Sequence, residues 1–174
     1  MIQVGRKAPD FTAQAYVRGD FATVRRDDFR GRWLVLFFYP LDFTFVCPTE
    51  LRAFAHKEAA FRQRGADVAA ISVDSIYTHQ AWLERDLPEV RFPVLSDVTR
   101  TITRDYGVLL EDEGVAMRAT FVIDPESVVR YLVVSSQDVG RSVEDVLRVL
   151  DALHTGHLCP AEWRPGQPTL GAGK

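Results

Sequence analysis

The stretch Trp33-Leu-Val-Leu-Phe-Phe-Tyr39 is hydrophobic at odd and even positions alike. Such a run is typical of a central strand that is buried on both faces of a sheet. A loop, Pro40-Leu-Asp-Phe-Thr-Phe-Val46, follows the strand, and a helical pattern then extends from about Cys47 to Arg64, where Gly65 is a suitable end. The sequence therefore predicts a buried strand that leads through a short loop into a long helix.

The segments on either side of this unit carry further strand and helix patterns. The predicted strands are residues 67–73, 120–124 and 128–134, the last two flanking the turn Pro125-Glu-Ser127, with a hairpin near residues 12–24. The predicted helices are residues 78–86, residues 97–106 and a last helix that Ser142 opens and Gly156 ends. This order predicts a mixed α/β fold. It suits a thioredoxin-like fold, in which helices flank a central mixed sheet, with the N-terminal hairpin added.

The length and composition of the chain fit one domain with a sizeable core. It has 174 residues, 47% of them hydrophobic, and a net charge of −3 that is spread along the sequence. No internal repeat and no early linker divides it, so we expect one domain over residues 1–165 and a short flexible tail over residues 166–174. No basic block points to nucleic acid as a partner.

The start of the chain and its apolar runs bear on its location. The first residues, MIQVGRKAPDF, lack the basic stretch and apolar run of a signal peptide. The longest apolar run, Trp33 to Tyr39, is too short to cross a bilayer. We therefore expect a cytoplasmic protein that has no membrane partner.

The chain has two cysteines, Cys47 and Cys159, which lie far apart in the sequence. So few cysteines exclude a secreted disulfide scaffold, and a zinc site or a CxxC redox pair would need close spacing. One interpretation is that both are small, inert, buried side chains. The sequence around Cys47 favours a different one.

Cys47 stands where the buried strand passes to the helix, in the first helical turn. Pro48 fits this turn because its missing N–H would lack a helical partner anyway. The free amides and the positive end of the helix dipole favour an anion at this point. The position therefore favours the thiolate form of a cysteine.

Ionisation alone gives too small an effect for an enzyme. A free thiol with a pKa near 8.5 is about 3% ionised at pH 7, so full ionisation accelerates its reactions at most about 30-fold. Enzymes typically reach at least about a million-fold. A catalytic Cys47 therefore needs a cation and hydrogen-bond donors. Thr44, Pro40 and Arg118 are candidates, although each alone has an ordinary structural use as a turn residue, a loop rigidifier or a strand end.

Taken together, these residues resemble a known family. Pro40-Leu-Asp-Phe-Thr-Phe-Val-Cys-Pro-Thr-Glu50 matches the PxxxTxxC signature of peroxiredoxins, in the form found in typical 2-Cys members. Residues 112–125, Gly140-Arg-Ser142 and Leu158-Cys-Pro-Ala-Glu-Trp163 are similar to later segments of the family. The likeness covers roughly residues 3 to 165, and the branch it resembles most is the peroxidase subunit of bacterial alkyl hydroperoxide reductase.

The resemblance implies a thiol-dependent peroxidase with defined residue roles. Cys47 is the nucleophile that a hydroperoxide oxidises to sulfenic acid. Thr44 and Arg118 hold the peroxide oxygens, and Pro40 covers the site. No cofactor and no metal are implied.

The resemblance also implies a supporting network, a resolving cysteine and an assembly. Glu50 and Arg141 orient Arg118. Cys159 attacks the oxidised sulfur of the partner subunit in a homodimer and forms an intersubunit disulfide with it. In this family the dimers often assemble as a ring of five. The active-site turn has to unwind for this step. The disulfide is then reduced by thioredoxin or by a flavoprotein disulfide reductase.

Two features of the sequence bear on overoxidation. Hyperoxidation-sensitive relatives carry a GGLG insertion after the position of Trp82 and a C-terminal Tyr-Phe helix. Here Leu83-Glu-Arg-Asp-Leu-Pro-Glu89 follows Trp82, and the chain ends Thr169-Leu-Gly-Ala-Gly-Lys174. We expect the active-site turn to unwind readily, so that resolution outpaces overoxidation. Trp82 itself is expected to pack beside the site.

The residues leave one other function open and disfavour a third. A redox-switched chaperone or peroxide sensor would carry the same motifs. A cysteine hydrolase would need a histidine base. The four histidines, His56, His79, His154 and His157, lie in no catalytic motif, and we expect them at helix surfaces or caps.

Overall fold

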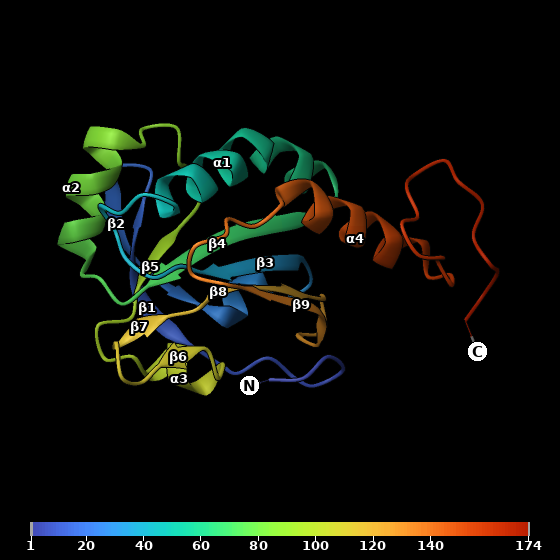
Figure 1. Ribbon diagram of the computed structural model, residues 1–174, viewed down its shortest axis with the longest axis horizontal. Helices are drawn as coiled ribbons and strands as arrows, with labels where there is room; N and C mark the ends of the chain where they lie inside the picture. The colour runs from blue at the N-terminus through green and yellow to red at the C-terminus, as the bar shows by residue number, and fades with distance from the viewer. Residues whose placement is uncertain (1, 174) are drawn as a thin grey trace.

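A seven-stranded sheet forms the centre of the molecule (Figure 1). The computed structural model describes residues 2–173. The strand order is β2-β1-β5-β4-β3-β8-β9. The strands of this sheet are β1 (Thr12–Val17), β2 (Asp20–Arg25), β3 (Trp33–Phe38), β4 (Ala66–Ser72), β5 (Val94–Ser96), β8 (Arg118–Ile123) and β9 (Val129–Ser135). A separate pair joins β6 (Leu109–Leu110) to β7 (Val115–Ala116).

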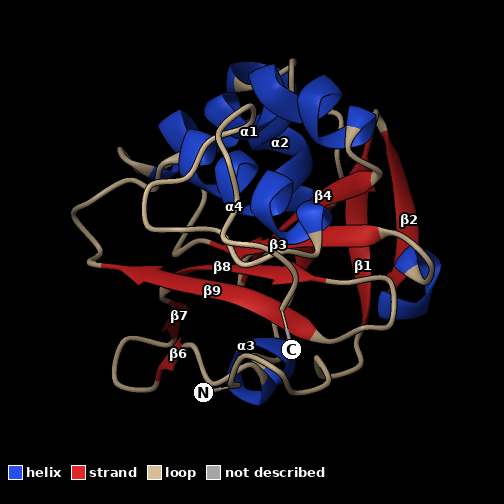
Figure 2. Cartoon of the chain, turned by 90° about the vertical axis from the view of Figure 1, so that its right-hand side faces the viewer, coloured by secondary structure: helices blue, strands red, loops and turns tan. Residues whose placement is uncertain are grey.

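Helices lie on both faces of the sheet (Figure 2). They are α1 (Cys47–Gln63), α2 (Ile76–Asp86), α3 (Thr101–Asp105) and α4 (Val143–Thr155), and a 3-10 turn spans Arg26–Phe29. On one face lie α1, α2 and α4, and on the other lie α3 and the β6–β7 pair. No helix in the described part of the chain has the length and hydrophobicity needed to span a bilayer.

The strand β3 is buried on both faces, as its sequence predicts. Val35 and Phe37 belong to the core beneath α1 and α4, whereas Leu34 and Leu36 belong to the core on the α3 face. Each of these side chains is at most 2% exposed. Burying a side chain of this kind contributes about 1.5–3 kcal/mol to the free energy of folding, so β3 stabilises the packing on both faces of the sheet.

The strand pairings confirm the predicted mixed sheet. β3 runs parallel to β4 and antiparallel to β8. β8 and β9 form the predicted antiparallel hairpin around the turn at Ser127. The predicted N-terminal hairpin is the β1–β2 pair, in which Val17 lies opposite Asp20 across the two-residue turn Arg18-Gly19.

Residues 97–106 differ from their prediction as one helix. Only Thr101–Asp105 is helical, as α3. The buried carboxylate of Asp97 accepts hydrogen bonds from the backbone amides of Ile102 and Thr103. Arg100 has a left-handed φ of 59°, so the helix begins only after it, at Thr101. Asp97 therefore caps α3 from outside it instead of beginning it.

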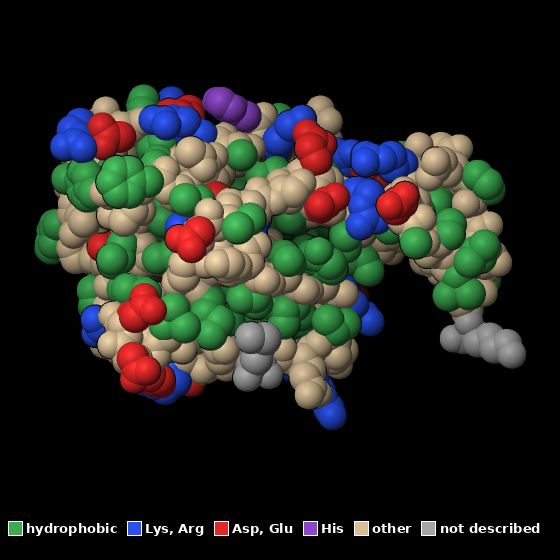
Figure 3. All heavy atoms as spheres, viewed as in Figure 1, with side chains coloured by type: hydrophobic (Ala, Val, Ile, Leu, Met, Phe, Trp, Pro, Cys, Tyr) green, Lys and Arg blue, Asp and Glu red, His purple; other side chains and the backbone are tan. Residues whose placement is uncertain are grey.

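The C-terminal segment after α4 forms an arm (Figure 1). The amide of Leu158 donates to the carbonyl of Gly171, and the amide of Leu170 donates to the carbonyl of Leu158. The space-filling view shows a notch between this arm and the body of the molecule (Figure 3). Met1 and Lys174, the outer residues of the predicted domain and tail, lie outside the described residues.

Candidate active site

Cys47 is the first residue of α1 and is fully buried. The chain leaves β3 at Phe38, turns through the loop of residues 39–46 and enters α1 with Pro48 in the first turn. The amides of Thr49 and Glu50 bond back to Val46. The amino end of α1, which stabilises negative charge, therefore carries the sulfur, as the sequence predicts.

Arg118 places a cation against this sulfur from the neighbouring strand β8. Its Nη1 lies 3.3 Å from Cys47 Sγ and 2.8 Å from Glu50 Oε2. Its Nε donates to the carbonyl oxygen of Gln137 at 2.7 Å. The side chain is only 5% exposed, so little water screens the guanidinium.

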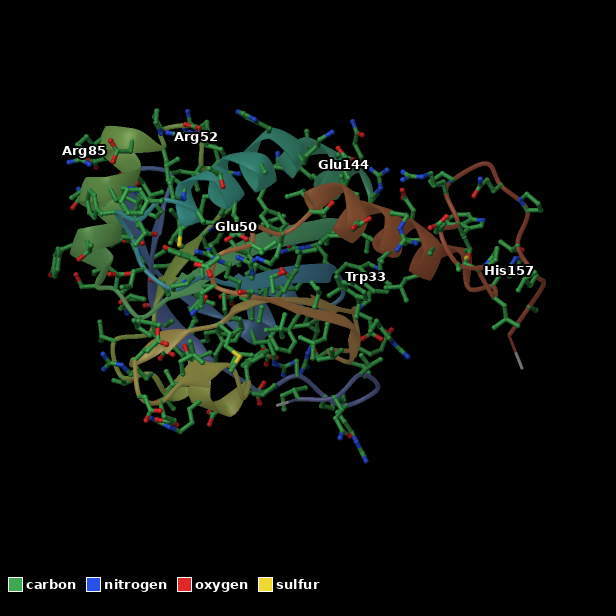
Figure 4. All side chains as sticks on the ribbon, viewed as in Figure 1. Trp33, Glu50, Arg52, Arg85, Glu144 and His157 are labelled. Carbon is green, nitrogen blue, oxygen red and sulfur yellow. The ribbon has the colours of Figure 1, made fainter. Side chains whose placement is uncertain are left out.

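Glu50 joins Arg118 to a second arginine, Arg141. Nε and Nη2 of Arg141 donate to the two oxygens of Glu50 at 2.7 and 2.8 Å, and its backbone amide donates at 2.9 Å. Burial by itself raises the pKa of Glu50, but the hydrogen bonds and charge of Arg141, together with Arg118, hold that pKa below its usual value. Figure 4 shows Glu50 in the interior, between α1 and the sheet.

The second arginine is fixed by the sheet itself. Nη1 of Arg141 donates to the carbonyl oxygens of Phe38 and Ala119 at 2.8 Å and lies 3.2 Å from Thr120 Oγ1. The guanidinium therefore spans β3 and β8. Two buried arginines and one ionised glutamate leave one surplus positive charge, which a Cys47 thiolate would balance.

Thr44 and Pro40 lie in the loop before Cys47, and both are half-buried. The hydroxyl of Thr44 donates to the carbonyl of Leu41 at 2.9 Å. Within residues 2–173 no hydrogen bond joins it to Cys47. Thr44 is thus three residues from Cys47 in the sequence, but its hydroxyl proton is donated to another residue of the loop and not to the sulfur.

His79 does not lie at a helix surface, and that prediction is wrong. Its side chain is fully buried, with Nδ1 at 2.7 Å from Asp42 Oδ2 and Nε2 at 3.0 Å from the carbonyl oxygen of Leu95. Tyr39 donates to the other oxygen of Asp42 at 2.7 Å. Burial raises the pKa of Asp42, and His79 opposes this. The network ties the active-site loop to α2 and β5.

Trp82, His56 and His154 lie as predicted, whereas His157 lies beyond the end of α4, on the C-terminal arm. His56, His154 and His157 are exposed. Trp82 is 1% exposed and packs beside the active-site loop, with its ring centre 6.0 Å from that of Phe43 and 6.0 Å from that of Tyr39.

Cys159 is a free, half-buried thiol beyond the end of α4. Lys57 pairs with Glu144 at 2.5 Å, and Arg64 pairs with Asp151 at 2.6 Å, so α4 runs alongside α1 in the same direction. Cys159 therefore lies at the far end of α1, roughly 25 Å from Cys47 by helix length. Figure 4 shows His157, on the same arm, far from Glu50.

Comparison with known proteins decides the family. Residues 4–132 match the model of the AhpC/TSA family. The chain belongs to this family, as a 2-Cys peroxiredoxin. It is 47% identical to Peroxiredoxin-2 of Mus musculus, over 97% of this chain and 89% of that protein. It is 45% identical to a putative peroxiredoxin in a rubredoxin operon of Clostridium pasteurianum, over 96% of this chain and 98% of that protein.

Solved peroxiredoxin structures match the fold. The reduced 2-Cys peroxiredoxin of Plasmodium vivax superposes with a TM-score of 0.92 at 39% identity, over 97% of this chain and 93% of that chain. Mycobacterium tuberculosis AhpC superposes with a TM-score of 0.86 at 39% identity, over 94% and 99% of the two chains. These matches confirm the predicted thioredoxin-like fold with its peroxiredoxin elaboration.

The sequence alone does not indicate five residues of this peroxiredoxin site. They are Tyr39, Asp42 and His79 in the loop network, Thr120 beneath Arg141, and Gln137 behind Arg118. Gln137 acts through its backbone carbonyl, which leaves no mark on the sequence. His79 and Asp42 are far apart in the chain, and a buried pair between them has no periodic signal.

Proposed function

We propose that this peroxiredoxin reduces hydrogen peroxide and organic hydroperoxides, with Cys47 as the attacking nucleophile. The observation that carries the proposal is the 3.3 Å contact between Cys47 Sγ and Arg118 Nη1 in a buried cluster with a surplus positive charge. The ionised sulfur balances that charge. The guanidinium also stabilises negative charge that develops on oxygen as the O–O bond breaks.

The first step is a displacement on oxygen. The Cys47 thiolate uses one electron pair to form an S–O bond with the hydroperoxide, and the O–O bond breaks. Its electron pair leaves on the departing oxygen, which takes up a proton as water or an alcohol. The sulfur is thereby oxidised to sulfenic acid and the peroxide is reduced.

Neighbouring residues prepare this displacement. Arg118 contacts the reacting sulfur and donates to a peroxide oxygen, and the Thr44 hydroxyl supplies a second donor after turning from the Leu41 carbonyl. Pro40 shields the sulfur from bulk water. Glu50 and Arg141 act as positioning residues, since their hydrogen bonds fix the guanidinium of Arg118.

The second step needs motion and a second chain. Cys47 is fully buried, so the first turn of α1 has to unwind before another thiol reaches it. The Cys159 of the same chain lies at the far end of α1. We therefore assign resolution to the Cys159 of another copy in a homodimer, and we assign this homodimer as the unit of a ring of five dimers. Its thiolate forms an S–S bond with the sulfenic sulfur and releases hydroxide, which becomes water.

The resulting disulfide has to be reduced by an external dithiol. Relatives carry the names thioredoxin peroxidase, in Echinococcus granulosus, and thioredoxin-dependent peroxide reductase, in Mus musculus. We assign a thioredoxin-type or flavoprotein disulfide reductase as the partner here. Residues 1–165 act as one functional domain in this scheme.

Steady-state peroxide consumption with a thioredoxin system tests the proposal. Wild type should turn over repeatedly. Cys47→Ser should lose all activity, whereas Cys159→Ser should react once with peroxide, form no disulfide dimer on a non-reducing gel and stop. A Cys47→Ser variant that still turns over, or a Cys159→Ser variant that still forms the full disulfide dimer, would overturn the assignment.

A further inference from the structure

A groove lined by arginines lies on the side of the molecule away from Cys47. Two adjoining cavities, of about 280 Å³ and 450 Å³, share the side chains of Arg18, Glu58, Arg62 and Arg91. We call them together the arginine groove. Because α1 rises about 1.5 Å per residue, the residues of α1 that line the groove, from Ala55 to Arg62, lie about 12 to 22 Å along the helix from Cys47, so the groove is separate from the catalytic site.

The charges of the groove are unbalanced. Its three carboxylates already have arginine partners, in the pairs Glu58–Arg62 at 2.6 Å, Asp67–Arg32 at 2.6 Å and Glu89–Arg52 at 3.1 Å. In the part of the chain that the structure describes, Arg18 and Arg91 have no carboxylate partner. Two exposed guanidiniums on one cavity wall are therefore available to an anion.

Arg18 reaches this position through an unusual backbone conformation. It has a left-handed φ of 51° in the two-residue β1–β2 turn, where Gly, Asn or Asp is the ordinary choice. Its Nε donates to the carbonyl oxygen of Arg91 at 3.4 Å, which brings the two residues together. A long charged residue at a conformationally costly position indicates a use for its side chain.

One wall of the 280 Å³ cavity is apolar. Phe29 and Phe92, which are 8% and 3% exposed, line it together with Val17 and Pro93. Arg32 lies next to Trp33, which Figure 4 shows at the end of β3 away from Glu50. An apolar wall beside paired guanidiniums suits a ligand that has both a hydrophobic and an anionic part.

We propose that the arginine groove binds a phosphate-bearing organic anion, such as a nucleoside phosphate. Arg18 and Arg91 hold phosphate oxygens through the forked N–H donors of their guanidiniums. The organic part of the ligand lies against the apolar wall formed by Phe29, Phe92 and Pro93. The volume of the two cavities together accommodates such a molecule.

Calorimetric titration of the reduced full-length protein with ADP tests this inference. Adenosine and inorganic phosphate are titrated separately, to divide the contributions of the two parts of the probe. The double variant Arg18→Gln/Arg91→Gln removes both unpaired guanidiniums. Arg6→Gln/Arg30→Gln removes the same charge from exposed positions outside the groove and serves as the matched control. Peroxide turnover reports that each variant is folded.

ADP should bind saturably, more tightly than adenosine or inorganic phosphate, and more weakly as salt rises. The affinity should fall by about tenfold for each guanidinium lost, while the control pair keeps it and all variants retain turnover. Absence of saturable binding, equal affinity for inorganic phosphate, or the same loss in both double variants would overturn the proposal.

Discussion

Arg118→Ala separates the two effects of the guanidinium that contacts Cys47. The variant removes the side-chain donor that lies 3.3 Å from the sulfur, in a site that is almost closed to water. If the arginine acted only by favouring the thiolate, the loss at pH 7 would be limited to about 30-fold, the ionisation ceiling of a free thiol. Loss of one donor to the developing oxyanion adds about 100- to 1,000-fold.

The expected result is a rate constant for peroxide that falls by about 1,000-fold or more at pH 7. Stopped-flow measurement of the first oxidation, with Cys159→Ser in the background, isolates this step. Raising the pH until a free thiol is fully ionised should recover at most about 30-fold. The fold should survive because Glu50 keeps its paired hydrogen bonds to Arg141.

Arg104→Ala serves as the matched control, because it removes an exposed arginine that pairs with Glu111. Its rate should equal that of the parent. Full recovery of the Arg118→Ala rate at high pH would contradict a role in stabilising the departing oxygen, since it would confine Arg118 to ionising the sulfur.

Three further outcomes follow from the same contacts. Glu50→Gln should lower the free energy of unfolding in urea by about 3 kcal/mol or more, because two buried arginines lose their anion. Since the pKa of Glu50 is lowered in the fold, its contribution is present above its unfolded pKa of about 4.3 and is lost as the pH falls through the folded value. Stability of the variant should therefore depend less on pH below about 4 than that of wild type, and equal pH dependence would contradict the assigned charge. His79→Ala should lower the free energy of unfolding by about 3 kcal/mol, because it leaves Oδ2 of the buried Asp42 and the carbonyl oxygen of Leu95 without the imidazole that bonds to both. His56→Ala on the exposed face of α1 should cost at most about 0.5 kcal/mol. Equal losses of unfolding free energy in the two variants, measured by urea denaturation, would contradict a stabilising role for the loop network. During turnover at low peroxide, wild type should convert little Cys47 to sulfinic acid, as mass spectrometry would show. Sulfinic acid on Cys47 at low peroxide, while turnover continues, would contradict rapid unwinding of the active-site turn.

The sequence predicts the parts of the fold that carry strong local patterns. β3 is apolar on both parities, and α1 and α4 carry helical stripes with suitable ends, so their bounds are recovered closely. β5 is three residues long, too short for a periodic signal. The late start of α3 depends on the Asp97 carboxylate bonding to Ile102 and Thr103, a tertiary choice that overrides local propensity.

The site shows the same division between local pattern and long-range contact. The motif around Cys47 and the segments at Arg118 and Arg141 indicate residues that the fold brings together through Glu50. The pairing of His79 with Asp42 joins α2 to the active-site loop, and no local pattern predicts it. Long-range hydrogen bonds of this kind follow only from the assembled sheet.

Reaction of the reduced protein with one equivalent of hydrogen peroxide, followed by peptide mass spectrometry, tests the central role of Cys47 most directly. Cys159→Ser should gain a single oxygen on Cys47, trapped by a sulfenic-acid reagent, whereas wild type should instead join Cys47 to the Cys159 of another chain. Consumption of peroxide with Cys47 left as a free thiol would contradict this role of Cys47.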